Sequence, residues 1–208
     1  MNMVESAVSR SIVERVKNIC ISPDAEWTVI DGESATTAGL ITGYVVPLAA
    51  VSAVAGFIGR SVIGVTLPFV GGTYRVPFVS GLVAAVLSVA LTAVGVVVCA
   101  YVIDALAPTF GAQKNQAQAM KVAAYAPTAS WVAGILQIIP ALGVLALLGA
   151  IYSLYVLYLG LPRLMKAPSD KAIGYTVAVV ITVIVIGAVI GIVSTMFLAN
   201  PLAPNLVQ

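Results

Sequence analysis

The charged residues divide the chain into apolar stretches that are long enough to cross a lipid bilayer. A membrane helix needs about 20 predominantly apolar residues. Three apolar intervals are each long enough for one such helix. Two lie between charged residues, and the third follows the last charged residue. They predict membrane spans at about residues 37–57, 78–103 and 172–198.

A longer apolar interval covers residues 122–162 and has no charge in its 41 residues. This length is too great for one span and suits two. Pro140, in "IIPALG", marks the break, because proline has no amide hydrogen and disfavours helix at the residue before it. The interval therefore predicts a third span at about 122–139 and a fourth at about 141–161.

The N-terminal region has the pattern of an amphipathic helix. Apolar side chains recur every four residues and polar ones fill the other faces, so one stripe is apolar. Such a helix either lies on the bilayer surface or docks on the bundle. In "SPDAEW", Trp27 is expected at headgroup depth as an interfacial anchor. The apolar stripe comprises Val4, Val8, Ile12, Val16 and Cys20.

Together these patterns predict an all-α integral membrane protein, a bundle of five transmembrane helices with an N-terminal amphipathic helix. Composition agrees: 61% of residues are hydrophobic and 9% are charged, whereas a soluble domain carries about 25% charged residues. The segment 60–75 is too short to cross and is expected to be an interfacial loop. The expected division is 1–35 as a cytoplasmic amphipathic segment, 36–200 as the membrane domain and 201–208 as a short tail.

The distribution of Lys and Arg predicts the orientation of the chain in the membrane. With five spans, one side collects eight of the ten basic residues and the other side only Arg60 and Arg75. Because cytoplasmic loops are enriched in Lys and Arg, the N-terminus is expected in the cytoplasm and the C-terminus on the periplasmic or extracellular side. The net charge of +2 is too small to indicate a nucleic-acid partner.

The second predicted span carries a regular stripe of small residues. Their spacing alternates between four and three, which keeps them on one helix face where another backbone can approach closely. We interpret the stripe as a helix-packing seam, with homo-oligomerisation as the alternative. The seam comprises Gly81, Ala85, Ser88, Thr92, Gly95 and Cys99, together with Gly187 and Gly191 in the last span.

Residues for catalysis or metal binding are not evident. Buried charges in a membrane indicate function because they cost several kcal/mol, and none lies near a predicted span centre. The chain has no His, and it lacks a phosphate-binding loop or a Cys cluster. No catalytic residue, metal or cofactor is predicted, so the protein is expected not to be an enzyme.

Tyr152 is the polar residue that most needs an explanation. It lies about 14 Å from Leu161, at 1.5 Å per residue, so it is deep in the predicted fourth span. A buried phenol needs a hydrogen-bond partner, such as Ser88, Thr92 or a carbonyl freed by Pro140 or Pro127. The alternative is a hydrated or lipid-binding cavity lined by Ser88, Thr92, Tyr125, Trp131 and Tyr152.

Several short motifs resemble the bacterial YIP domain family of membrane proteins. They are "ISPDAEW", "FGAQKN", "YAPTASW", "IPALG", "YLGLPRLMKAP" and "GYT". The resemblance implies five spans with a cytoplasmic N-terminus. Eukaryotic relatives act in vesicle traffic and associate with small GTPases through cytoplasmic regions, but their long N-terminal arm is reduced here to about 35 residues. The resemblance supplies no catalytic residues.

Two functional hypotheses follow. The first is a non-enzymatic polytopic inner-membrane protein that organises membrane or binds protein partners through its cytoplasmic face. That face would comprise the N-terminal helix and the loops around 114–121 and 163–171. The second is a small permease, channel or lipid-handling protein with a weakly polar intramembrane cavity.

Overall fold

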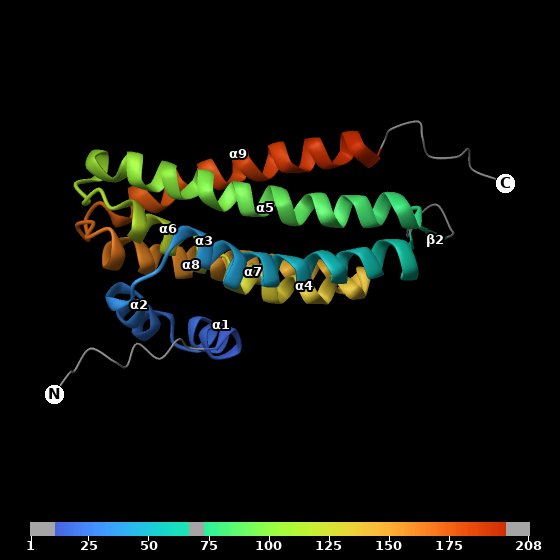
Figure 1. Ribbon diagram of the computed structural model, residues 1–208, viewed down its shortest axis with the longest axis horizontal. Helices are drawn as coiled ribbons and strands as arrows, with labels where there is room; N and C mark the ends of the chain where they lie inside the picture. Colours follow the sequence, from blue (N-terminus) through green and yellow to red (C-terminus); the bar gives the residue numbers. More distant parts are fainter. Residues whose placement is uncertain (1–10, 67–72, 199–208) are drawn as a thin grey trace.

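The chain forms an elongated bundle of helices, which a computed structural model describes for residues 11–66 and 73–198 (Figure 1). Long helices run side by side, with α5 (Phe78–Leu106) packed against α9 (Ala172–Leu198) and against α4 (Val46–Phe57). Another long helix, α8 (Ala146–Leu164), also contacts α9. The remaining elements are α1 (Ile12–Ile21), α2 (Pro23–Gly32), α3 (Thr37–Leu40), η1 (Ile41–Val45), η2 (Ile58–Ile63), β1 (Val65–Thr66), β2 (Thr73–Tyr74), η3 (Ala107–Phe110), α6 (Gln116–Tyr125), α7 (Thr128–Ala133), η4 (Gly134–Ile138) and η5 (Pro140–Leu145).

Four helical stretches in the described part of the chain are long and apolar enough to cross a membrane. They correspond to the predicted first, second, fourth and fifth spans. The first is longer than expected because helix continues through the π-helical η2 to Ile63, past Arg60. The stretches are Thr37–Ile63, Phe78–Phe110, Pro140–Leu164 and Ala172–Val189.

The predicted third span, 122–139, is not one continuous helix. It is divided into α6, α7 and the 3₁₀ segment η4. Pro127 explains the first break, since it cannot donate to the carbonyl of the preceding turn. The Thr128 hydroxyl donates to the Tyr125 carbonyl at 2.6 Å and so satisfies a backbone acceptor at this break. Five spans formed by five unbroken helices are therefore not found within the described residues.

The divided segment nevertheless runs the length of the bundle. At its start, Lys121 donates to the Ile30 carbonyl of α2 at 2.9 Å. Near its other end, the Gln137 carbonyl lies so close to Gly59 that a Cβ there would be 2.0 Å from the oxygen. At Pro140 the chain turns back into η5, and Ile139 is extended, as the proline predicts.

The segment expected as an interfacial loop, 60–75, contains the end of η2 and a small hairpin. Strands β1 and β2 pair antiparallel, with Val65 opposite Tyr74. Gly64 has a φ of 91°, a conformation that glycine adopts without strain. Residues 67–72 of the expected loop lie outside the described residues, as does the predicted tail at 201–208.

The small-residue stripe of α5 faces the interior of the bundle. None of its six residues is exposed, whereas Val83, Val86 and Val94 on other faces are. A Cβ on Gly81 would lie 2.1 Å from the Ser61 hydroxyl, so this glycine permits a close approach to η2. The two glycines of α9 differ from this pattern: Gly187 and Gly191 are exposed, with no atom near the position of an added Cβ. Among the described residues, no neighbouring helix therefore packs against these two glycines.

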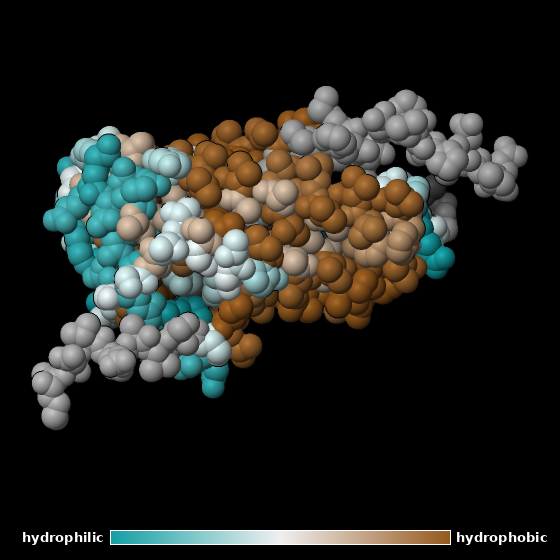
Figure 2. Space-filling view, viewed as in Figure 1, coloured by the Kyte–Doolittle hydropathy of each residue, from teal (hydrophilic) through white to brown (hydrophobic). Residues whose placement is uncertain are grey.

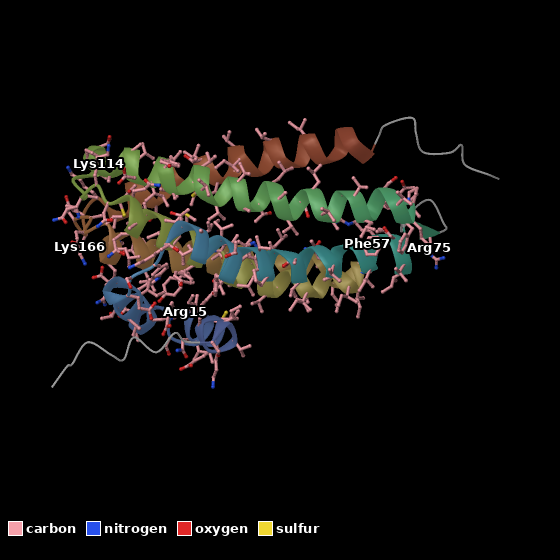
Figure 3. All side chains as sticks on the ribbon, in the orientation of Figure 1. Arg15, Phe57, Arg75, Lys114 and Lys166 are labelled. Atoms are coloured by element: carbon pink, nitrogen blue, oxygen red, sulfur yellow. The ribbon has the colours of Figure 1, made fainter. Side chains whose placement is uncertain are left out.

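Surface polarity separates the two ends of the bundle. Figure 2 shows apolar surface over most of its length, polar surface at the end that carries α2 and α6, and a smaller polar patch at the other end. Lys114 and Lys166 lie at the first of these ends and Arg75 at the opposite one (Figure 3). We call the first the charged end, comprising α1, α2 and the loops 111–115 and 165–171.

Candidate functional site

The charged end is built on two short helices rather than on one amphipathic helix. Helix α1 begins after Ser11, whose hydroxyl accepts a hydrogen bond from the Glu14 amide at 3.2 Å. Pro23 occupies the first turn of α2, and the acidic residues Asp24 and Glu26 follow it, which suits the positive end of the helix dipole. Val4 and Val8 of the predicted stripe lie outside the described residues.

A buried ion-pair cluster holds α1 and α2 together. Arg15 is 5% exposed and Glu26 is 3% exposed. The Arg15 Nη1 atom lies 2.5 Å from Glu26 Oε1, and its Nη2 atom lies 2.5 Å from both carboxylate oxygens of Glu33. The guanidinium also lies over the Tyr125 ring, 5.3 Å from its centre. Since the charge is compensated on three sides, the cluster fixes the angle between the two helices.

The cluster keeps Arg15 charged although it is buried. Burial acts to lower the pKa of Arg15, but the hydrogen-bonded and nearby charges of Glu33 and Glu26 outweigh it, so the net direction is upward. Breaking a buried pair by removing one partner costs about 3–5 kcal/mol, because it leaves an uncompensated charge. Arg15 is therefore required for the docked arrangement.

Helix α6 binds the C-terminal end of α2. Lys121 is 3% exposed, and its ammonium donates to the carbonyls of Ile30 and Glu33. The Gln118 amide donates to the Asp31 carboxylate at 2.9 Å. A cation at a helix C-terminus is favourable because the last carbonyls carry partial negative charge. The divided third segment thus begins by fixing α2 to the bundle.

Trp27 is a buried docking residue, and its prediction as an interfacial anchor is wrong. Its side chain is 1% exposed, and its indole N–H donates to the Val156 carbonyl of α8 at 2.9 Å. The ring covers Gly160, where a Cβ would lie 2.7 Å from two indole carbons. Tyr125 meets the indole edge-on, with ring centres 6.5 Å apart. A slot formed by the missing side chain of Gly160 therefore receives the tryptophan.

Tyr152 also bonds to the N-terminal helices. Its hydroxyl donates to the Cys20 carbonyl of α1 at 2.9 Å. The prediction that this phenol needs a partner is confirmed, whereas the partners expected, Ser88, Thr92 or a carbonyl freed by proline, are wrong. The sequence offers no signal for Cys20, because it lies 132 residues away.

The five predicted cavity residues do not share one polar site. The Ser88 hydroxyl donates within its own helix to the Ala85 carbonyl, and Thr92 lies one turn further along α5. The Trp131 carbonyl accepts from Ser52 of α4 at 2.6 Å. Tyr125 packs edge-on against Tyr44, with ring centres 4.7 Å apart. The contacts of Trp131, Tyr125 and Tyr152 therefore involve three different partner elements, α4, η1 and α1.

Tyr44 and Thr128 form a further buried polar contact next to Tyr125. Their hydroxyls lie 2.8 Å apart, and Tyr44 is 5% exposed. This contact joins η1 to the start of α7. It lies next to the break at Pro127, where backbone groups lack their helical partners.

Exposed ion pairs connect the outer side of α2 to the end of α8 and the loop that follows it. Arg163 contacts Asp24 at 2.8 Å, and Lys166 contacts Asp31 at 2.6 Å. Each exposed pair contributes about 0–1 kcal/mol, so these pairs orient the surface more than they stabilise it. Helix α8 continues through Pro162 to Leu164, which brings Arg163 beside α2.

Sequence reasoning did not identify the buried cluster. No buried contact was predicted for Arg15, Glu26, Glu33 or Lys121, because charged side chains are mostly exposed in folded proteins. One signal was present: Glu26 and Glu33 are seven residues apart, the spacing of one helix face. Among the described residues, no group of three or more His, Cys, Asp or Glu side chains could hold a metal ion.

Comparisons with known proteins agree with the motifs found in the sequence. The model of the Yip1 domain matches residues 17–191, a range that includes both N-terminal helices except the first residues of α1. The chain is 30% identical over 158 residues to "Inner membrane protein YohC" of Escherichia coli (strain K12), covering 74% of this chain and 80% of that protein. The same identity and coverage hold for the protein of that name from Escherichia coli O6:H1. No solved structure matches the chain significantly.

Proposed function

This chain belongs to the Yip1 domain family and is a multi-pass inner-membrane protein, and on that premise we propose that it is a non-enzymatic membrane scaffold. Its charged end is the cytoplasmic face and binds protein partners. The observation that carries this proposal is the docking of α1 and α2 through Arg15 and Trp27.

Docking of α1 and α2 matters because it lowers the entropy cost of binding a partner. A flexible N-terminal arm loses conformational entropy when it binds, whereas a surface that is already ordered does not. Here the buried cluster and the indole slot fix α2, and the pairs of Arg163 and Lys166 orient its outer side. The result is a preorganised surface in which acidic and basic side chains alternate.

The proposed topology has five crossings, with α6, α7 and η4 together forming the third. Contacts at Lys121 and at Gly59 support this assignment, because they lie at opposite ends of the bundle. Broken helices are tolerated in membranes where protein surrounds the irregular backbone, and residues 124–126, 128 and 129, around the break at Pro127, are buried. Five crossings place eight basic residues on the cytoplasmic side.

Site-specific photo-crosslinking in cells tests the proposal. A photoreactive residue is placed at Thr28 of α2 or at Lys114, both exposed at the charged end, and at Val86, which is 65% exposed on the apolar face of α5. We expect discrete adducts with another protein from Thr28 and Lys114 that are absent from Val86. Adducts that are missing, or shared by all three positions, would reject a partner-binding face.

A further inference from the structure

Helix α1 has a second face that the bundle does not cover. Arg15 and Ile19 point into the protein. On the opposite side, Val13, Lys17 and Ile21 recur every four residues, and all three are exposed. The exposed fraction is 77% for Val13 and 68% for Ile21. An outer stripe with two large apolar side chains and one lysine differs from the wholly polar outer face of a solvated helix.

The hydrogen bond to Tyr152 gives the depth of α1. The distance from Pro140 to Tyr152 follows from the helical rise. The chain passes through the six residues of η5, which rise about 2.0 Å each, and the first seven residues of α8, which rise about 1.5 Å each. Tyr152 therefore lies about 22 Å from Pro140, and Pro140 is at the end of the bundle opposite the charged end. With Pro140 placed at the far boundary of a hydrocarbon core about 30 Å thick, Tyr152 lies about 8 Å inside the core from the charged side.

The direction of α1 also fits a helix that lies in the membrane plane. Figure 1 shows α1 nearly end-on, whereas α5 and α9 extend along the long axis of the bundle. The axis of α1 thus crosses the axis of the bundle. Interfacial amphipathic helices lie in this plane with their apolar faces about 5–10 Å into the headgroup–acyl boundary.

We infer that the outer face of α1 is inserted into the phospholipid leaflet on the charged side of the bundle. Val13 and Ile21 lie among the upper acyl chains, and the Lys17 side chain extends towards the phosphates, as lysines at interfaces do. Figure 2 shows apolar surface over most of the length of the bundle, which is where the acyl chains lie in this arrangement. Helix α1 is held by protein on one face and by lipid on the other. This inference does not depend on a protein partner.

Nitroxide accessibility in phospholipid nanodiscs tests the inference on the full-length protein. In a Cys20→Ser, Cys99→Ser background, single labels are placed by Val13→Cys and Ile21→Cys, whose exposed side chains leave the packing intact. Thr28→Cys on the exposed side of α2 is the aqueous control, and Val86→Cys on α5 is the lipid control. Collision with oxygen reports lipid, and collision with a water-soluble nickel chelate reports water.

We expect labels at residues 13 and 21 to show higher oxygen and lower nickel accessibility than the Thr28 label, at a depth of about 5–10 Å. An elution profile by gel filtration that matches the unlabelled protein confirms folding of each variant. Aqueous accessibility at either α1 position, equal to that of the Thr28 label, would overturn the inference.

Discussion

Replacing Trp27 by alanine should release α1 and α2 from the bundle without disturbing the membrane helices. The indole is 1% exposed, fills the slot above Gly160 and donates to the Val156 carbonyl. Its removal leaves that slot empty, because alanine cannot reach across it. The long helices α4, α5 and α9 keep their own contacts, so the loss is local.

The expected magnitude follows from the size of the contact. Replacing a buried tryptophan by alanine costs about 3–5 kcal/mol. The hydrogen bond adds little, since hydrogen bonds measured within a membrane protein average about 0.6 kcal/mol. At 1.4 kcal/mol for each factor of ten, a cost of about 3–5 kcal/mol should raise the opening equilibrium of the docked helices by roughly 10²- to 4 × 10³-fold.

Amide hydrogen exchange measured by mass spectrometry on the protein in nanodiscs reports this opening. Peptides covering residues 12–33 should exchange roughly 10²- to 4 × 10³-fold faster in Trp27→Ala, while peptides from α5 remain unchanged. Thr28→Ala is the matched control, because this neighbouring side chain is exposed and bonds only within α2, to the Asp24 carbonyl. Equal exchange of residues 12–33 in the two variants would refute the docking role of Trp27.

Four further substitutions, two of them combined in one variant, test other contacts. Arg15→Met should destabilise the docked helices by about 3–5 kcal/mol, and adding Glu26→Gln should restore part of the loss in the same exchange assay; no restoration would contradict a buried charge pair. Gly59→Ala should lower thermal stability by about 1–3 kcal/mol through its clash with Gln137, and a melting curve as stable as wild type would show that the contact is absent. Tyr44→Phe should lose only about 0.6 kcal/mol, measured by the same melting curves, and a loss above 2 kcal/mol would contradict a single hydrogen bond to Thr128.

The membrane helices could be predicted because charge and apolar length are local properties of the sequence. Arg60 and Arg75 bracket the hairpin, and Lys171 precedes α9 almost directly. Pro140 also identified a true break, since its effect on Ile139 depends only on covalent geometry. Pro127 has the same chemistry, but one span was predicted across it, whereas the helix breaks there.

The candidate site could not be predicted, because its contacts join residues that are distant in the sequence. Trp27 has a composition-based preference for headgroups, and only the packing of α8 creates a slot at Gly160. Arg15 looks like a solvated residue of an amphipathic helix until α2 folds back and brings Glu26 and Glu33 to it. Pairing of this kind depends on tertiary structure, which hydrophobic periodicity alone does not specify.

The most direct test of the account is an electron cryo-microscopy map of the protein in lipid nanodiscs. We expect the map to show Trp27 over Gly160, with its indole nitrogen at the Val156 carbonyl, and Arg15 between Glu26 and Glu33. A map in which the long helices are clear but α1 and α2 are detached from α8, with the slot at Gly160 empty or filled by lipid, would contradict a preorganised face.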